Sequence, residues 1–258
     1  MQLMRHPLGL LGLALAAPGL LLLGYLVSLK RSVALGRNLP VLQALGMGAC
    51  MRLNKHVVFH MYGVYGLTLQ AQAQAKCDLL AAQAGEITPR HVCFLGSSTF
   101  TYWRNLREDF APGRLVYNAG FGGSTTLDLF PCLNGLVFRF APQTIVYYCG
   151  INDVGAGRTG REAFQGFAEF VAEVRKQLPQ ARVVYVGMIL SPYHLFCGNA
   201  REVGLGNGLA KEFCERQGAN MAFVDTQTLH SRSLYVNDGL HLNDHGHRLL
   251  GELILPAL

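Results

Sequence analysis

Acidic residues are absent from the first 77 positions of this 258-residue chain, and the first one to occur is Asp78. The same stretch contains seven lysines and arginines, so its formal charge is +7, whereas the rest of the chain has 15 basic and 16 acidic residues. A nucleic-acid-binding protein spreads basic residues over the docking face of a folded domain. Here the basic residues flank a hydrophobic stretch, so we expect anionic lipid head groups as partners and no nucleic acid.

Charged residues of any sign are also scarce, at 15 %, against 50 % hydrophobic residues, and this composition excludes a disordered chain. The seven cysteines are odd in number and include no Cys-x-x-Cys pair, which gives neither a disulfide framework nor a zinc site. Three histidines lie within residues 241–247, but His245 and His247 are expected on different faces of a helix. We therefore expect no metal and no cofactor.

The longest run without charge extends from Pro7 to Leu29. As a helix it measures about 35 Å, enough to cross an apolar layer of about 30 Å. We expect an N-terminal transmembrane helix, with residues 1–37 forming a single-pass anchor and its basic flank. A signal sequence cleaved after Ala34 and a buried core helix are the alternatives.

The basic residues beside this run bear on its orientation. Arg5 lies on one side, and Lys30, Arg31 and Arg37 lie on the other. This count favours a C-terminal domain that faces the cytoplasm. Unpaired cysteines are consistent with a reducing compartment, but an exported domain stays open as the alternative.

The remaining chain is expected to have two parts. Residues 38–90 form a membrane-proximal helical or interfacial segment, which contains a strong helix former from Leu67 to Ala84 and ends near Pro89. From residue 91 to residue 258, apolar runs alternate with helical patterns. The apolar runs cover residues 92–95, 115–117, 144–149, 182–189 and 222–224. The helical patterns cover residues 100–108, 125–138, 161–178 and 203–217, with a last one from about Asn243. This alternation predicts an α/β fold, in which helices cover both faces of a five-stranded parallel sheet.

Three residues in this region are typical of nucleophilic catalysis. Asp238 precedes His241 by three positions, so its carboxylate can reach the imidazole and fix which ring nitrogen faces a nucleophile. Ser98 follows the first apolar run, and a serine needs such an imidazole as its base. The chain order Ser…Asp…His is compatible with a catalytic triad.

Two further segments, residues 118–125 (NAGFGGST) and 148–153 (YCGIND), also follow apolar runs. Acyl transfer needs hydrogen-bond donors aimed at the oxygen that becomes negative. A glycine turn presents a bare backbone N–H at close range, and the Asn152 carboxamide supplies two more donors. Ligands in open α/β sheets bind where strands end, which is where all these residues are placed.

The order of nucleophile, glycine, asparagine and histidine resembles the four-block pattern of the SGNH, or GDSL-type, hydrolases over roughly residues 91–258. The resemblance implies a three-layer, flavodoxin-like α/β/α fold. It implies that Ser98 is the nucleophile, with its own backbone N–H as the first oxyanion donor. Gly123 and Asn152 would be the other two donors.

The resemblance also implies that His241 is the base and Asp238 its orienter, with no cofactor. One position departs from the pattern, since Ser97 stands where the family has aspartate in Gly-Asp-Ser. That aspartate is not a triad member, so the change affects local packing of the loop.

Other conspicuous side chains have structural interpretations. Asn243 is expected to cap the last helix, and Asp153 is expected to hold its loop by hydrogen bonds beside Asn152. Trp103 and Tyr102 fit a substrate pocket and a core equally well, and His194 is expected in a surface loop, with a pocket residue as the alternative.

The sequence therefore predicts a membrane-anchored serine hydrolase that cleaves a carboxylic ester through an acyl-enzyme. The substrate would be an acyl or acetyl ester, either a small molecule or one linked to lipid or glycan, and membrane lipid would contact the N-terminal segment. An O-acyltransferase with the same triad and a non-catalytic lipid- or glycan-binding domain are the alternatives. The oligomeric state is left open.

Overall fold

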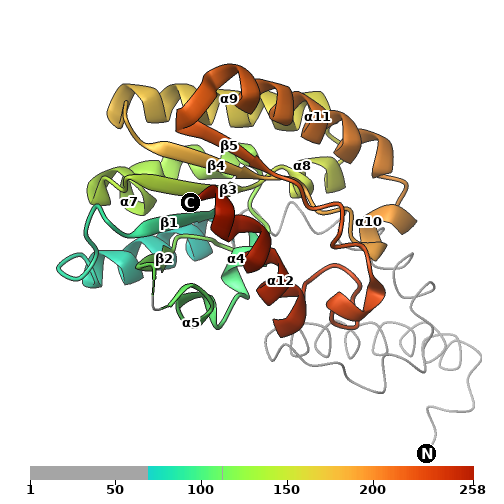
Figure 1. The fold of residues 1–258 in the computed structure, drawn as a ribbon, viewed down its shortest axis with the longest axis horizontal. Coiled ribbons are helices and arrows are strands. Elements are labelled where there is room, and N and C mark those ends of the chain that lie inside the picture. The colour runs from blue at the N-terminus through green and yellow to red at the C-terminus, as the bar shows by residue number, and fades with distance from the viewer. Residues whose placement is uncertain (1–68, 112) are drawn as a thin grey trace, which may run out of the picture.

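A computed structural model of the protein describes residues 69–111 and 113–258, which form an α/β fold around one parallel sheet (Figure 1). The strands are β1 (Val92–Gly96), β2 (Val116–Asn118), β3 (Thr144–Tyr148), β4 (Arg182–Val186) and β5 (Met221–Val224). Their order in the sheet is β2-β1-β3-β4-β5, and each neighbouring pair is parallel. This is the flavodoxin-like order, so the prediction of a five-stranded parallel sheet is confirmed.

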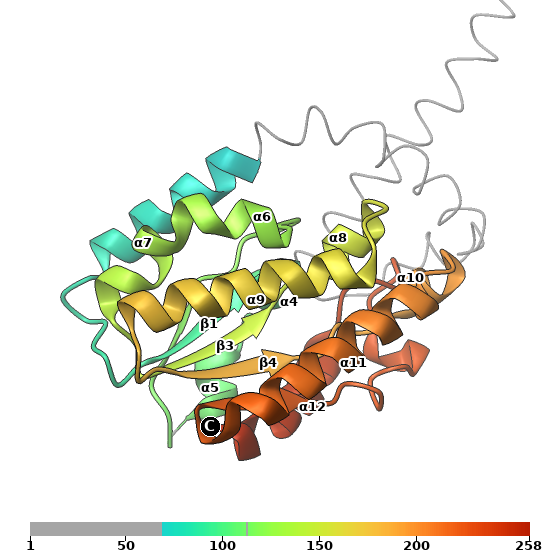
Figure 2. The same cartoon turned by 90° about the horizontal axis from the view of Figure 1, so that it is seen from above.

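Helices cover both faces of the sheet (Figures 1 and 2). On one face lie a helix over residues 69–82 and the helices α6 (Thr126–Leu129), α7 (Leu133–Leu136), α9 (Gly160–Gln177) and α11 (Ala200–Gln217). On the other face lie α4 (Ser98–Thr101), α5 (Leu106–Phe110) and α12 (Asp244–Ile254). The short helices α8 (Ile151–Gly155) and α10 (Pro192–Phe196) follow β3 and β4.

The side chains of each strand point alternately to the two faces of the sheet, and so they contribute to two hydrophobic clusters. In β1, Cys93 and Leu95 pack among the helices of the first face, whereas Val92 and Phe94 pack among those of the second. Successive side chains of a strand point to opposite faces, so a strand that is apolar at every position is buried on both sides. This explains why the strands read as continuous apolar runs.

Two of the predicted helices are broken in the structure. Instead of one helix over 100–108, α4 ends at Thr101 and α5 begins at Leu106. The side-chain amide of Asn118 donates to the carbonyl oxygen of Phe100 at 2.6 Å, and a continuing helix would need that carbonyl as an acceptor. Over 125–138, a 3-10 turn that contains Pro131 separates α6 from α7, because proline has no N–H to donate.

The helix over residues 69–82 is part of the same packed body as the sheet. Its side chains Leu69, Ala73 and Leu80 are buried in the hydrophobic cluster of the first face. The region expected to be membrane-proximal, residues 38–90, therefore contributes a helix to the core of the α/β fold.

The predicted transmembrane helix over Pro7–Leu29 lies outside the described residues. Among the helices of residues 69–258 that the structure describes, none combines the length and apolarity needed to cross a membrane.

Candidate active site

Ser98, His241 and Asp238 form a continuous chain of hydrogen bonds. The distance between Ser98 Oγ and His241 Nε2 is 2.9 Å, and that between His241 Nδ1 and Asp238 Oδ2 is 2.6 Å. Because a carboxylate only accepts, Nδ1 carries the proton and Nε2 presents its lone pair to the serine hydroxyl. This tautomer is the one in which the imidazole can take the serine proton.

The carboxylate of Asp238 is held in its ionised form. Burial raises the pKa of Asp238, but the charge of His241 and hydrogen bonds from His241 and Leu240 outweigh that effect and lower the pKa. Asp238 Oδ1 accepts the backbone N–H groups of Leu240 and His241 at 2.8 and 2.9 Å. One carboxylate therefore orients both the backbone and the ring of His241.

The loop that carries this pair is fixed at both ends. Gly239 has φ +67°, a left-handed conformation that favours glycine, and its N–H donates to the carbonyl of Val236. Asn243 Oδ1 accepts the N–H of Gly246 at 3.0 Å, so Asn243 caps α12 as predicted. The cap fixes the residue at which the loop ends and α12 begins.

His247 ties α12 to the segment that carries Ser98. Its Nε2–H donates to the carbonyl of Thr99 at 2.9 Å, and its ring stacks on Trp103 with centroids 5.2 Å apart. His247 is buried, whereas His245 is exposed, so the two point in different directions as predicted. This contact sets the position of α12 against α4, and with it the distance between His241 and Ser98.

Ser98 is the first residue of α4, directly beyond β1. A Cβ atom at Gly96 would lie 2.1 Å from the carbonyl oxygen of Tyr148 in β3, so only glycine fits before the turn. Ser97 is buried, and its hydroxyl is without a hydrogen-bond partner among the described residues. The loop is therefore held here by the Ser97 backbone, whose N–H donates to the carbonyl of Tyr148 at 3.2 Å, and not by the Ser97 side chain.

The glycine turn lies on one side of Ser98 and Asn152 on the other, because β1 lies between β2 and β3 in the sheet. Gly123 has φ +79°, which requires a residue without a side chain. Asn152 Nδ2 donates to the carbonyl of Ser124 at 2.9 Å, and the hydroxyl of Ser124 donates to the carbonyl of Gly96 at 3.2 Å. These bonds lock the three loops together and leave the second N–H of the Asn152 amide for another acceptor.

An ion pair between Asp153, which is buried, and Arg158, which is partly exposed, also supports this arrangement. Asp153 accepts the N–H of Thr126 at 2.9 Å, its hydroxyl at 2.7 Å and a guanidinium N–H of Arg158 at 2.7 Å. Sequence reasoning anticipated the hydrogen-bonding role of Asp153, but it missed Ser124, Thr126 and Arg158. Their partners are 5 to 32 positions away in sequence, so no local pattern marks them.

The expectation that His194 lies in a surface loop is wrong. His194 is 3 % exposed in α10, where Asn199 Nδ2 lies 2.9 Å from its Nδ1. Burial and, to a smaller extent, the nearby His241 lower the pKa of His194 to about 4. Trp103 is a core residue, 2 % exposed, and its indole N–H donates to Asp109. Within the described part of the chain, no cluster of side chains has the composition of a metal site.

A comparison with protein families gives a match to the GDSL-like Lipase/Acylhydrolase family over residues 68–249. The chain belongs to this family. Family membership makes the protein an enzyme of the serine esterase class. The match begins at residue 68, so the helix over 69–82 lies within the part that resembles the family.

Solved structures share the fold of this GDSL-like enzyme. A Streptococcus pneumonia protein whose name refers to platelet activating factor has a TM-score of 0.65 and 18 % identity, covering 76 % of this chain and 97 % of that one. A GDSL-like lipase from Bacteroides thetaiotaomicron has a TM-score of 0.60 and 16 % identity, covering 70 % and 96 %. A mutant of an acetyl-xylooligosaccharide esterase from Geobacillus Stearmophilus has a TM-score of 0.53 and 17 % identity, covering 66 % and 94 %. No curated protein sequence matches the GDSL-like enzyme.

Proposed function

We propose that the protein hydrolyses a carboxylic ester through an acyl-enzyme on Ser98. The observation that carries the proposal is the hydrogen-bonded chain from Ser98 Oγ through the His241 ring to the Asp238 carboxylate. His241 Nε2 removes the proton of Ser98 as Oγ attacks the ester carbonyl, and the resulting imidazolium is stabilised by Asp238. His241 then returns the proton to the alkoxy oxygen, and the alcohol leaves.

Water completes the reaction. His241 takes a proton from a water molecule, which attacks the acyl carbon, and the proton then passes to Ser98 Oγ as the carboxylic acid is released. In both acylation and deacylation, the carbonyl oxygen of the substrate becomes negative and needs hydrogen-bond donors. We assign this role to the backbone N–H groups of Ser98 and Gly123 and to the second N–H of the Asn152 amide.

Replacement of the serine tests the assignment. Ser98→Ala and His241→Ala should each abolish turnover of a short-chain 4-nitrophenyl ester, because the members of a triad act as a unit. Ser97→Ala is the matched control, since it removes a neighbouring hydroxyl that has no partner in the described structure. Full activity in Ser98→Ala, or its loss in Ser97→Ala alone, would move the nucleophile away from Ser98.

The same acyl-enzyme can pass its acyl group to an alcohol instead of water. Product analysis in the presence of glycerol separates the two outcomes. An esterase releases mainly free acid, whereas an O-acyltransferase forms mainly the new ester.

We further propose that the uncharged run Pro7–Leu29 and its basic flank attach the enzyme to a membrane, with the catalytic domain on the cytoplasmic side. Full-length protein should resist alkaline extraction from membranes, because an apolar segment rather than charge retains it. Removal of residues 1–31 should release it without loss of esterase activity, since all proposed catalytic residues lie after residue 90. A mature chain that begins near residue 35 would identify a cleaved signal instead.

A further inference from the structure

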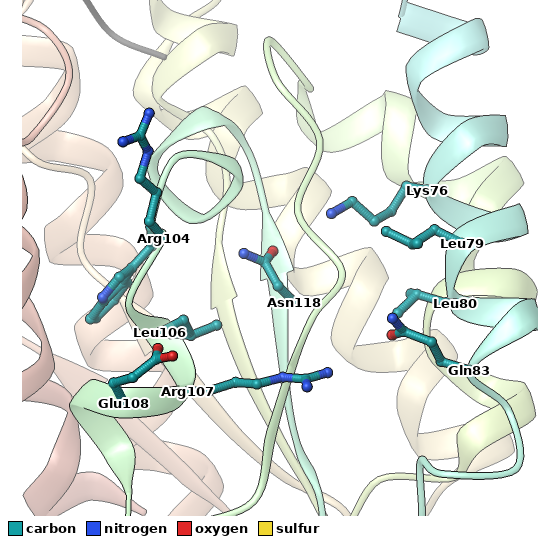
Figure 3. A pocket seen from close by; sticks show the side chains of 10 residues that line it. Lys76, Leu79, Leu80, Gln83, Arg104, Leu106, Arg107, Glu108 and Asn118 are labelled. Atoms are coloured by element: carbon teal, nitrogen blue, oxygen red, sulfur yellow. The ribbon is translucent and has the colours of Figure 1, made fainter. Parts of the chain in front are cut away.

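A cavity of about 230 Å³ opens between the helix over residues 69–82 and the α4–α5 segment, beside the edge strand β2 (Figure 3). Ten residues line it, and it receives side chains from both helical layers. Lys76 and Gln83 come from the first layer, Arg104 and Arg107 from the second, and Asn118 from the end of β2.

The lining of this cavity carries an excess of positive charge. Lys76, Arg104 and Arg107 are basic, and Glu108 is the one acidic residue among the ten. None of these three basic side chains forms an ion pair or hydrogen bond with another residue that the structure describes. Figure 3 shows the ammonium group of Lys76 and the guanidinium group of Arg107 extending into the space from opposite walls.

Lys76 is the most unusual of the three. It is partly buried, and this burial lowers the pKa of its ammonium group. A desolvated charge without a partner is unfavourable, and such groups are normally paired. An anion in the cavity would supply the missing partner, and Arg107 offers planar N–H donors that suit a phosphate or a carboxylate.

The helix that lines the cavity also reaches the candidate active site. A Cβ atom on Gly123 would lie 3.2 Å from Leu69 Cδ2, and one on Gly122 would lie 3.2 Å from Gln72 Oε1. Lys76 follows Gln72 by one helical turn, about 6 Å along the axis. The helix therefore spans from the proposed oxyanion donors to the cavity.

The opposite wall is connected to the nucleophile as well. Arg104 follows α4, which begins at Ser98, by three residues. The Asn118 side chain donates to the carbonyl of Phe100 and accepts the N–H of Gly120 at 2.9 Å, so it joins the α4 segment to the glycine turn. One lining side chain of the cavity, Asn118, is therefore hydrogen-bonded to the two loops that carry Ser98 and the glycine turn.

We propose that this cavity binds an anionic group, a phosphate or a carboxylate, carried by the ester substrate. The proposal rests on the esterase function above and narrows its substrate class to esters that also carry a negative charge. Glu108 is exposed, as are Arg104 and Arg107, so water solvates these three charges, and Lys76 is the least solvated charge of the lining.

Two pairs of substrates test this proposal. The two esters of each pair differ mainly in that one carries an anionic group and the other does not. The first pair is 1-butyrylglycerol 3-phosphate and 1-butyrylglycerol, with the charge on the alcohol. The second is 4-nitrophenyl hemisuccinate and 4-nitrophenyl butyrate, with the charge on the acyl group. The wild-type enzyme should favour the anionic ester of at least one pair, and the pair shows which part of the substrate carries the anion.

Lys76→Gln and Arg107→Gln should each lower kcat/KM for that anionic ester about tenfold, the usual loss for one charge-assisted hydrogen bond, and leave the neutral ester unchanged. Lys211→Gln is the control, because Lys211 is exposed on α11, which packs against β5 at the opposite edge of the sheet. Equal kcat/KM within both pairs, or a preference that survives in both cavity variants, would overturn the inference while the esterase function stands.

Inorganic phosphate gives a readout that does not depend on catalysis. At equal ionic strength, phosphate should raise Tm above its value in chloride for the wild-type and Lys211→Gln proteins, because a ligand of the folded state stabilises it. Lys76→Gln and Arg107→Gln should lose this shift. An equal shift in all four proteins would mean that phosphate binds elsewhere and would contradict the proposal.

Discussion

In the proposed mechanism, the side chain of Asn152 serves structure and catalysis together. One N–H of its amide is used by the Ser124 carbonyl, so the amide plane is fixed before a substrate arrives. An oxyanion donor that is oriented in advance needs no reorganisation when charge develops. The remaining N–H is then available at the place where the ends of β1 and β3 meet.

Replacement of Asn152 separates these two contributions. Asn152→Ala should lower kcat by roughly 10²–10³, or about 2.7–4 kcal/mol, the usual loss for one oxyanion donor. KM should change little if the bond forms mainly in the transition state. Steady-state kinetics on a neutral ester, together with Tm, provide the measurement. An unchanged kcat under conditions where chemistry limits the rate would assign Asn152 to structure alone.

Asp153, next to Asn152, has a structural role. Asp153→Ala would leave the hydroxyl and N–H of the buried Thr126, and the guanidinium group of Arg158, without their shared acceptor. The Arg158 side chain is 30 % exposed, so water can solvate its charge, and the main cost is that of the buried donors of Thr126, about 1–3 kcal/mol. Urea denaturation of Asp153→Ala against wild type checks this value. A loss below about 1 kcal/mol would show that water replaces the carboxylate.

At the scale of elements, α9 and α11 approach each other closely through glycine. A Cβ atom on Gly206 would lie 2.9 Å from the carbonyl oxygen of Gly160 and 2.5 Å from Met188 Cε. Gly208, two residues further along α11, has nothing within 4 Å of such an atom. The close approach of α9 and α11 therefore requires glycine at position 206, whereas position 208 has room for a side chain.

Gly206→Ala and Gly208→Ala form a matched pair. Gly208→Ala should raise the free energy of unfolding by about 0.5–1 kcal/mol, because alanine favours the helix over glycine. Gly206→Ala should lower it by about 1–3 kcal/mol, since overpacking outweighs that gain. Chemical denaturation of both variants measures the difference, and a stabilised Gly206→Ala protein would mean that the helices separate at little cost.

The sequence predicts elements best where its pattern is local. The continuous apolar runs identified all five strands, because burial on both faces requires apolar side chains at every position. The break between α4 and α5 was missed, since it depends on the Asn118 amide 18 residues from Phe100. The expectation for His194 failed for the same reason, because its burial results from how α10 packs in three dimensions.

At the scale of the whole molecule, two buried histidines couple stability to pH. Burial lowers the pKa of both His194 and His247 to about 4, although the bond to Thr99 and the charge of Asp244 partly oppose this at His247. In the unfolded chain each has a pKa of about 6.5. The unfolded state therefore binds more protons between these values, and stability falls as the pH drops from about 6.5 to about 4.

His247→Gln tests this coupling and keeps a donor for the Thr99 carbonyl. Between pH 7 and pH 4, the decrease in the free energy of unfolding should be smaller than in wild type by about 2–3 kcal/mol, since each pKa unit is worth about 1.4 kcal/mol. The exposed His245→Gln protein should behave like wild type. Parallel pH profiles for all three proteins would show that His247 is not protected from protonation.

The most direct test of the claim that Ser98 is the nucleophile is to identify the serine that reacts with an active-site label. The protein is treated with a fluorophosphonate, which reacts with an activated serine, and the labelled residue is identified by peptide mass spectrometry. We predict one phosphonylated residue, Ser98, with no label in Ser98→Ala and strongly reduced label in His241→Ala. Label on another serine, or undiminished labelling of Ser98→Ala, would contradict it.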